Sequence, residues 1–254
     1  MFTFQFFCLK KYIRICTYHI IMLDNGNKYT QMQKAYYDNE GRTGNMNREN
    51  HRGHNNNPNY WNILIGDTEN NKYIDKVGLD FGCGCGRNVI NLIGRFKKMD
   101  GVDISAELIK TCINNLLNMG FDNNKFSFYT CDGVSLSNID DNKYDFVMST
   151  IVLQHICVYS IRFNYLKEFF RIMKSGGLLS FQMGFGDGHF NTVPYHEDYY
   201  DAVSTNSGCD VKVSDQSEIE FDLRQIGFEN ISFTITDSHD DFHKQWIFVK
   251  AYKP

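Results

Sequence analysis

Hydrophobic positions along this chain follow two periods, one typical of strands and the other of helices. The strand-like runs are short and recur along the second two thirds of the chain. They lie at Val77–Phe81, Met99–Val102, Phe126–Tyr129, Tyr144–Ser149, Leu178–Met183, Ile231–Thr236 and Lys244–Lys250. The run at Tyr144–Ser149 is nearly continuous in apolar residues, which is typical of a central parallel strand.

Apolar residues at helical spacing follow several of these runs. The predicted helix faces are Val89, Leu92, Ile93 and Phe96; Leu108, Cys112, Leu116 and Met119; Phe163, Leu166, Phe170 and Met173; and Ile219, Leu223 and Ile226. Their predicted boundaries are a Ser105 cap with Gly120 at the end, a stop at Gly176-Gly177, and a Ser217/Glu220 capping box with Gly227 at the end.

The order of these elements predicts an α/β fold. Strand and helix alternate five times, after which one helix leads into the last two strands. No helix separates Ile231–Thr236 from Lys244–Lys250, so these two strands must pair antiparallel.

Three segments fall outside this alternation. Residues 1–21 are either a membrane-associating arm or residues that precede a true start at Met22. Residues 22–76 are predicted as an N-terminal cap segment, in which Asn57-Pro58 starts a helix with Trp61, Leu64 and Ile65 on its apolar face. Residues 184–213 carry many glycines and aromatic residues with little periodicity, which predicts a lid inserted into the domain formed by residues 77–254.

A glycine turn follows the first predicted strand and opens the first predicted helix. The stretch Asp80-Phe81-Gly82-Cys83-Gly84-Cys85-Gly86-Arg87 has the spacing G-x-G-x-G. Glycines leave the backbone bare, so a nucleotide-like ligand can lie directly against it. The turn does not fit the dinucleotide fingerprint, which needs a small residue where Arg87 stands. It does not fit a Walker loop either, because no Lys-Ser or Lys-Thr follows the last glycine.

Composition narrows the choice of partners. The chain has 254 residues and a net charge of −4, which gives no strong attraction to nucleic acid or to an anionic membrane. Eight cysteines are scattered without a disulfide framework, which fits a reducing cytoplasm. We expect no metal site, because the Cys83/Cys85 pair lies between glycines with no second Cys/His pair nearby. We also expect a monomer or homodimer.

Asp80 to Gly86 resembles the first motif of class I S-adenosylmethionine-dependent methyltransferases. The resemblance implies a Rossmann-like seven-stranded sheet of order 3-2-1-4-5-7-6 with an antiparallel last strand. It also implies that S-adenosyl-L-methionine is the cofactor and that part of the segment before the first strand folds over it, although residues 23–45 could equally be a floppy tail.

The same resemblance implies the cofactor-binding residues. Asp103, at the end of the second strand, would accept hydrogen bonds from the ribose hydroxyls, and Asp132 would accept one from the adenine amino group. Asp132 could instead be a simple turn residue before Gly133. Asp80 would lie near the methionine part. The full predicted set is Asp80, Gly82, Cys83, Gly84, Gly86, Asp103, Ile104, Asp132, Gly133 and Ser149.

Residues Asp145–Ile156 resemble the form found in small-molecule methyltransferases, and the three prolines exclude the Pro-Pro-Tyr and Pro-Cys motifs of nucleic-acid enzymes. We therefore expect methyl transfer to an oxygen or nitrogen of a small-molecule acceptor. Candidate bases are His155, His189 and His196. Two alternatives stay open at this point: a catalytically silent cofactor-binding protein and a nicotinamide-dependent oxidoreductase.

Overall fold

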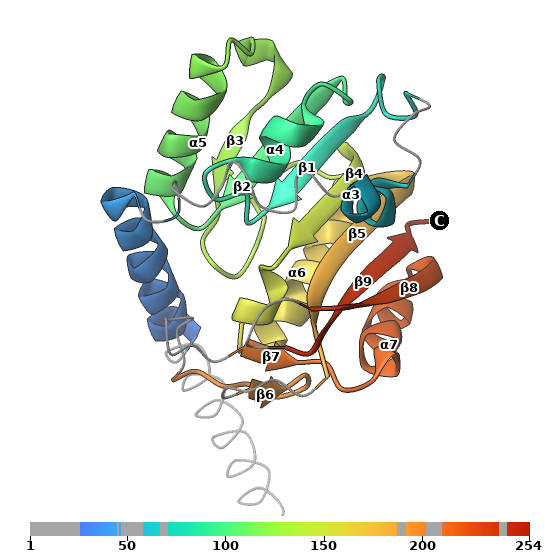
Figure 1. Cartoon of the computed structure of the whole chain (residues 1–254). Coiled ribbons are helices and arrows are strands. Elements are labelled where there is room, and N and C mark those ends of the chain that lie inside the picture. Colours follow the sequence, from blue (N-terminus) through green and yellow to red (C-terminus); the bar gives the residue numbers. More distant parts are fainter. Residues whose placement is uncertain are drawn as a thin grey trace, which may run out of the picture.

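A seven-stranded sheet forms the centre of the protein in the computed structural model, which describes residues 26–44, 46, 58–66, 71–186, 192–201, 210–238 and 243–254 (Figure 1). Its strands are β1 (Val77–Phe81), β2 (Lys98–Asp103), β3 (Phe128–Thr130), β4 (Tyr144–Thr150), β5 (Met173–Phe185), β8 (Glu229–Asp237) and β9 (Gln245–Tyr252). Their order is β3-β2-β1-β4-β5-β9-β8. Strands β1 to β5 pair in parallel, whereas β9 is antiparallel to both β5 and β8. The predicted Rossmann-like topology is confirmed.

Helices cover both faces of this sheet (Figure 1). They are α3 (Pro58–Ile65), α4 (Arg87–Leu92), α5 (Ala106–Asn118), α6 (Tyr159–Ile172), α7 (Gln216–Ile226) and an N-terminal helix over residues 26–43. Buried residues of α3, α4 and α5 form one apolar cluster with Phe146 and Met148, and those of α6 and α7 form the other with Leu79 and Phe81. Alternating side chains of each central strand therefore supply two separate cores.

Several helix ends follow the sequence signals. Ser105 caps α5 by accepting a hydrogen bond from the Leu108 amide, and α7 ends at Gly227, whose φ of 112° is left-handed. In α3, Trp61, Leu64 and Ile65 are buried as predicted. Asn57 lies outside the described residues.

Other boundaries were predicted wrongly. Helix α4 ends at Leu92, so Phe96 is buried from the following turn rather than from the helix. Met119 is the C-cap of α5 and is 56% exposed, because the helix ends before its side chain can turn inward. Gly176 lies within β5, since α6 already ends at Ile172.

The capping box of α7 and the start of the third strand also differ from the prediction. Asp215 and Glu218 form the box, whereas Ser217 donates its backbone amide to Asp215 from within the first turn. The third strand begins at Phe128 rather than Phe126, because its pairing with β2 begins at Phe128; a short 3-10 helix over residues 123–125 precedes it.

The described parts of residues 184–213 carry two further strands. Strands β6 (Thr192–Pro194) and β7 (Asp210–Lys212) pair in parallel beside the main sheet. Val193, Tyr195 and Val211 are buried in the α6/α7 core, so these strands pack into the domain.

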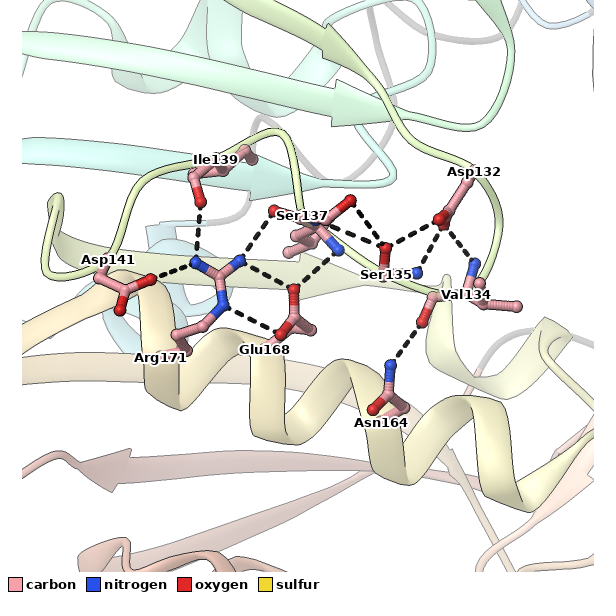
Figure 2. Close-up of polar contacts among 10 residues, drawn as sticks. Asp132, Val134, Ser135, Ser137, Ile139, Asp141, Asn164, Glu168 and Arg171 are labelled. Carbon is pink, nitrogen blue, oxygen red and sulfur yellow. Dashed lines mark hydrogen bonds and ion pairs between the residues drawn. The ribbon is translucent and has the colours of Figure 1, made fainter.

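Figure 2 shows how the connection from β3 to β4 is fastened to α6. Arg171 donates hydrogen bonds to the carbonyl oxygens of Leu136 and Ile139, each over 2.8 Å, and pairs with Glu168 over 2.8 Å. Glu168 in turn accepts a hydrogen bond from the Leu136 amide. One arginine on α6 thus satisfies backbone groups that have no strand partner.

We predict that Arg171→Ala lowers the free energy of unfolding by about 1–3 kcal/mol, because two partly buried carbonyl groups lose their donors. Urea unfolding followed by circular dichroism measures this change. Arg224→Ala is the matched control: its ion pair with Glu220 is an exposed i,i+4 pair, for which a change of about 0.5 kcal/mol or less is expected. If both substitutions lowered the free energy of unfolding equally, the hydrogen bonds from Arg171 to the β3–β4 connection would not be important for stability.

Candidate functional site

The glycine turn lies where β1 ends and α4 begins, and it is tied to the end of β2. The Gly82 amide donates to the Val102 carbonyl over 2.8 Å, and the Gly84 amide donates to Asp103 Oδ2 over 2.9 Å. Gly84 has a φ of 51°, and a Cβ added there would find no atom closer than 3.9 Å. The turn therefore presents bare backbone to open space at this position.

That space is a cavity of about 340 Å³ at the carboxyl ends of β1, β2 and β4. This is the edge at which open α/β sheets bind ligands, and the volume lies at the lower end of the usual range for small-molecule sites. Of the predicted residues, those that line the cavity are Gly82, Cys83, Gly84, Asp103, Ile104, Gly133 and His155.

Asp103 is held rigidly at the wall of this cavity. Asp103 is only 7% exposed, and its Oδ1 accepts a hydrogen bond from the Ser105 amide over 2.9 Å. Burial raises the pKa of this carboxyl, and the hydrogen bonds from Ser105 and Gly84 oppose that rise. Each oxygen keeps a lone pair for a further donor.

Asp80 lies beneath the cavity on the α4 side of β1. It is fully buried, and its Oδ1 accepts a hydrogen bond from Asn88 Nδ2 over 3.1 Å. Asn88 also donates to Thr150 Oγ1, and both Asn88 and Thr150 line the cavity. Asp80 Oδ2 and Asn88 Oδ1 are buried without a hydrogen-bond partner among the described residues. Burial raises the pKa of Asp80 to about 7.

Four predicted cofactor residues do not line the cavity: Asp80, Gly86, Asp132 and Ser149. Asp132 is exposed, and its Oδ1 accepts hydrogen bonds from the Val134 and Ser135 amides (Figure 2). Its Oδ2 accepts one from the Ser135 hydroxyl over 2.8 Å. Asp132 thus builds the turn that presents its neighbour Gly133 to the cavity.

The three candidate histidines lie in different places. His155, at the end of the 3-10 helix η3 (Leu153–His155), lines the cavity, and its Nδ1 lies 2.6 Å from Asp210 Oδ1. The side chain of His196 is 45% exposed and lies 3.8 Å from Asp222, away from the cavity lining. His189 lies outside the described residues.

Tyrosines of the predicted lid do not reach the cavity lining either. Tyr195 is buried and donates its hydroxyl to Asp222 on α7 over 3.1 Å. Tyr199 is 42% exposed. Tyr200 packs edge-on against Tyr29 of the N-terminal helix.

The N-terminal helix supplies residues that sequence reasoning missed. Tyr29, Gln33 and Tyr37 follow one another at intervals of four, and all three line the cavity. Tyr29 donates its hydroxyl to the His155 carbonyl over 3.3 Å and accepts from the Cys157 amide over 2.8 Å. The four-residue spacing was the available signal, although it lay within an asparagine-rich stretch with few apolar residues.

The turn after β4 has an unusual backbone. Ile151 has a φ of 58°, and this β-branched residue lines the cavity beside Thr150 and Val152. Such a conformation is disfavoured by about 1–3 kcal/mol and is concentrated at functional sites.

The described residues offer neither a membrane span nor a metal centre. No helix among them is long and apolar enough to cross a membrane. No group of three or more His, Cys, Asp or Glu side chains among them is arranged to hold a metal ion.

Comparison with known proteins gives the site its context. Residues 79–181 match the family model described as a methyltransferase domain. No curated protein matches the sequence.

Solved structures share the fold at low sequence identity. A methyltransferase from Methanosarcina mazei is 19% identical, with a TM-score of 0.57 over 77% of this chain and 97% of its own. Phosphoethanolamine N-methyltransferase 2 of Haemonchus contortus, in complex with S-adenosyl-L-methionine, is 18% identical, with a TM-score of 0.54 over 72% of this chain. The match spans only 49% of that protein. The [4+2]-cyclase SpnF is also 18% identical, with a TM-score of 0.55 over 72% of this chain and 77% of its own.

We predict that Asp80 makes the stability of the ligand-free protein depend on pH. Its carboxyl keeps a proton up to about pH 7 in the folded state but loses it near the ordinary value of 3.8 in the unfolded chain. The folded state therefore binds more protons between these values, and stability falls as the pH rises through them.

The measurement is urea unfolding of the wild type and of Asp80→Asn, which cannot ionise, from pH 4 to pH 8. The wild type should lose on the order of 2–4 kcal/mol relative to the variant over this interval. A difference that does not change with pH would show that Asp80 is ionised in the folded protein at every pH tested.

Proposed function

We propose that this chain, a class I S-adenosylmethionine-dependent methyltransferase by its matched domain and its sheet order, transfers the methyl group to an oxygen or nitrogen of a small molecule. The observation that carries the proposal is one cavity that joins the glycine turn to His155. A cofactor on one side and a base on the other would leave the acceptor between them.

The residues at the cavity fit S-adenosyl-L-methionine. Asp103 offers two fixed carboxylate oxygens for the ribose hydroxyls. Asp80 Oδ2 and Asn88 Oδ1 are buried acceptors that lack donors, and the ammonium of the methionine part would supply them, directly or through water. The adenine would lie toward Ile104 and Gly133, where the exposed Asp132 keeps a lone pair on Oδ2 for its amino group.

When bound, the cofactor would supply an electrophilic methyl group on a sulfonium sulfur: the lone pair of the acceptor would bond to the methyl carbon, and the C–S electrons would leave with the sulfur of S-adenosylhomocysteine. The protein contributes position and exclusion of water, because this displacement dissipates charge and is slowed by solvation. The tyrosines at positions 29, 37 and 165 line the cavity and would enclose the acceptor.

His155 is the residue that we propose as base. Its side chain is 24% exposed and lines the cavity, and its Nδ1 lies 2.6 Å from Asp210 Oδ1. A carboxylate only accepts hydrogen bonds, so it fixes the neutral ring with the proton on Nδ1 and the lone pair on Nε2. Nε2 could then take the proton of a hydroxyl or ammonium acceptor. His196 does not line the cavity, so we do not propose it as the base.

Neither alternative drawn from the sequence is favoured by an observation at the site. A nicotinamide-dependent oxidoreductase is disfavoured because Arg87 stands where a dinucleotide site has a small residue. It is also disfavoured because β9 pairs antiparallel with β5, whereas a dinucleotide-binding sheet continues in parallel. A silent cofactor-binding protein would not need Asp210 to hold a histidine that lines the cavity.

We predict that S-adenosylhomocysteine binds and that Asp103→Ala weakens its binding by about 1.5–3 kcal/mol, the usual loss for hydrogen bonds to a charged group. Isothermal titration calorimetry measures both affinities. His196→Ala is the control, and its affinity should stay within about twofold, well under 1 kcal/mol. A wild-type protein that binds NADH but neither S-adenosylmethionine nor S-adenosylhomocysteine would refute the cofactor assignment.

We predict that His155→Ala lowers the rate of methyl transfer by roughly a hundredfold or more, with relief at high pH as the acceptor ionises unaided. The assay follows label from tritiated S-adenosylmethionine into the small-molecule fraction of a cell extract. His196→Ala should retain the wild-type rate within a few-fold. Full activity of His155→Ala, with S-adenosylhomocysteine binding unchanged in both variants, would rule out His155 as the base.

A further inference from the structure

Asp210, at the start of β7, interacts with three side chains from two other segments of the chain: Gln154 and His155 of η3, and His243. Its Oδ1 lies 2.6 Å from His155 Nδ1. Its Oδ2 accepts from Gln154 Nε2 over 3.2 Å and lies 3.3 Å from His243 Nε2. Neither Asp210 nor His243 was among the residues predicted from the sequence.

This cluster is buried and tightly built. The side chains of Asp210 and His243 are 4% and 0% exposed. Burial alone would raise the pKa of Asp210, but His155 and His243 lower it, so the net pKa lies below the ordinary value. Asp210 is therefore a carboxylate anion wherever the protein is folded near neutral pH.

The end of β5 holds the other members of the cluster in place. The Gly184 amide donates to Gln154 Oε1 over 2.9 Å. A Cβ at Gly184 would lie only 2.1 Å from the His243 ring, so the ring occupies the space that a side chain would fill. Gln154 and His243 thus meet the same carboxylate oxygen from fixed positions, which leaves Oδ1 directed at His155.

We propose that Asp210 is the positioning residue for His155 in methyl transfer, and that His243 is a hydrogen-bond donor that holds Asp210 in place. The proposal rests on the function proposed above, in which His155 is the base. In this proposal His243 fixes the position of Asp210 and does not act as a second base.

The proton then has a defined course. A hydroxyl or ammonium acceptor gives its proton to His155 Nε2, and the electron pair of that bond stays on the acceptor atom that takes the methyl group. The imidazolium formed is paired with the Asp210 carboxylate through Nδ1, and it later releases the proton to solvent. Other groups that meet this segment are the hydroxyl of Tyr29, on the His155 carbonyl, and Arg162, on the Ile156 carbonyl.

The first test is independent of any acceptor. Long-range ¹H–¹⁵N spectra of the eight histidines, with His155→Ala to assign the signal, report which ring nitrogen carries the proton at a pH where the ring is neutral. Wild-type His155 should be protonated on Nδ1, and Asp210→Asn, whose amide can also donate, should lose this preference. A wild-type ring protonated on Nε2 would overturn the proposal, whatever reaction the protein catalyses.

The second test measures label transfer from tritiated S-adenosylmethionine to the small-molecule fraction of a cell extract. Asp210→Asn should be slower by roughly a hundredfold, because His155 then loses the tautomer in which it acts as the base. The acid limb of its pH–rate profile should move to lower pH, because the imidazolium loses its counter-charge. His243→Leu should be slower by about tenfold, the loss expected for one hydrogen bond.

His243→Gln keeps a hydrogen-bond donor at a similar reach, so it should recover most of the rate lost in His243→Leu and keep the wild-type pH profile. His196→Gln is the matched control, and all variants should bind S-adenosylhomocysteine as the wild type does. If His155→Ala is inactive while Asp210→Asn is fully active, the positioning role fails and the proposed function stands. A wild type without methyl transfer refutes the proposed function, and the ring spectra then decide the positioning role alone.

Discussion

The hydrogen bond from the Gly84 amide to Asp103 is the interaction on which the rest of the site depends. It joins the ends of β1 and β2, and the Gly82 amide adds a second link to the carbonyl of Val102. Because both strands run parallel, their carboxyl ends meet at one edge, and the loop between strand and helix is fixed there. The same carboxylate that shapes the turn faces the cavity, so loop geometry and ligand contact rest on one side chain.

Local patterns in the sequence were sufficient for the sheet. Every strand of the main sheet coincided with an apolar run, and the missing helix before Lys244–Lys250 correctly required an antiparallel pair. Boundaries were predicted less well, because the C-caps of α4 and α6 are Ile93 and Met173 rather than glycines, and β5 begins directly after α6. Asp215 rather than Ser217 caps α7, since an aspartate two residues earlier already satisfies the first amides.

The site could be predicted only where its residues follow strands in a known order. Asp103 and the glycine turn belong to that class. Tyr29, Asp210 and His243 come from segments far apart in the sequence, and no periodicity records that they meet. Asp132 shows the opposite limit: its place after the third strand suggested contact with the cofactor, but it does not line the cavity, and its oxygens accept hydrogen bonds within the turn that it builds.

Ile151 has a consequence for any effort to engineer the protein. Its left-handed backbone would suit glycine or asparagine better, so a screen for thermostability would select such replacements there. The same replacements would remove a branched side chain from the wall of the cavity. A replacement that raises thermal stability at this position therefore removes a contact with the ligand. Variants of Ile151 with higher thermal stability should be assayed for turnover before they are combined with others.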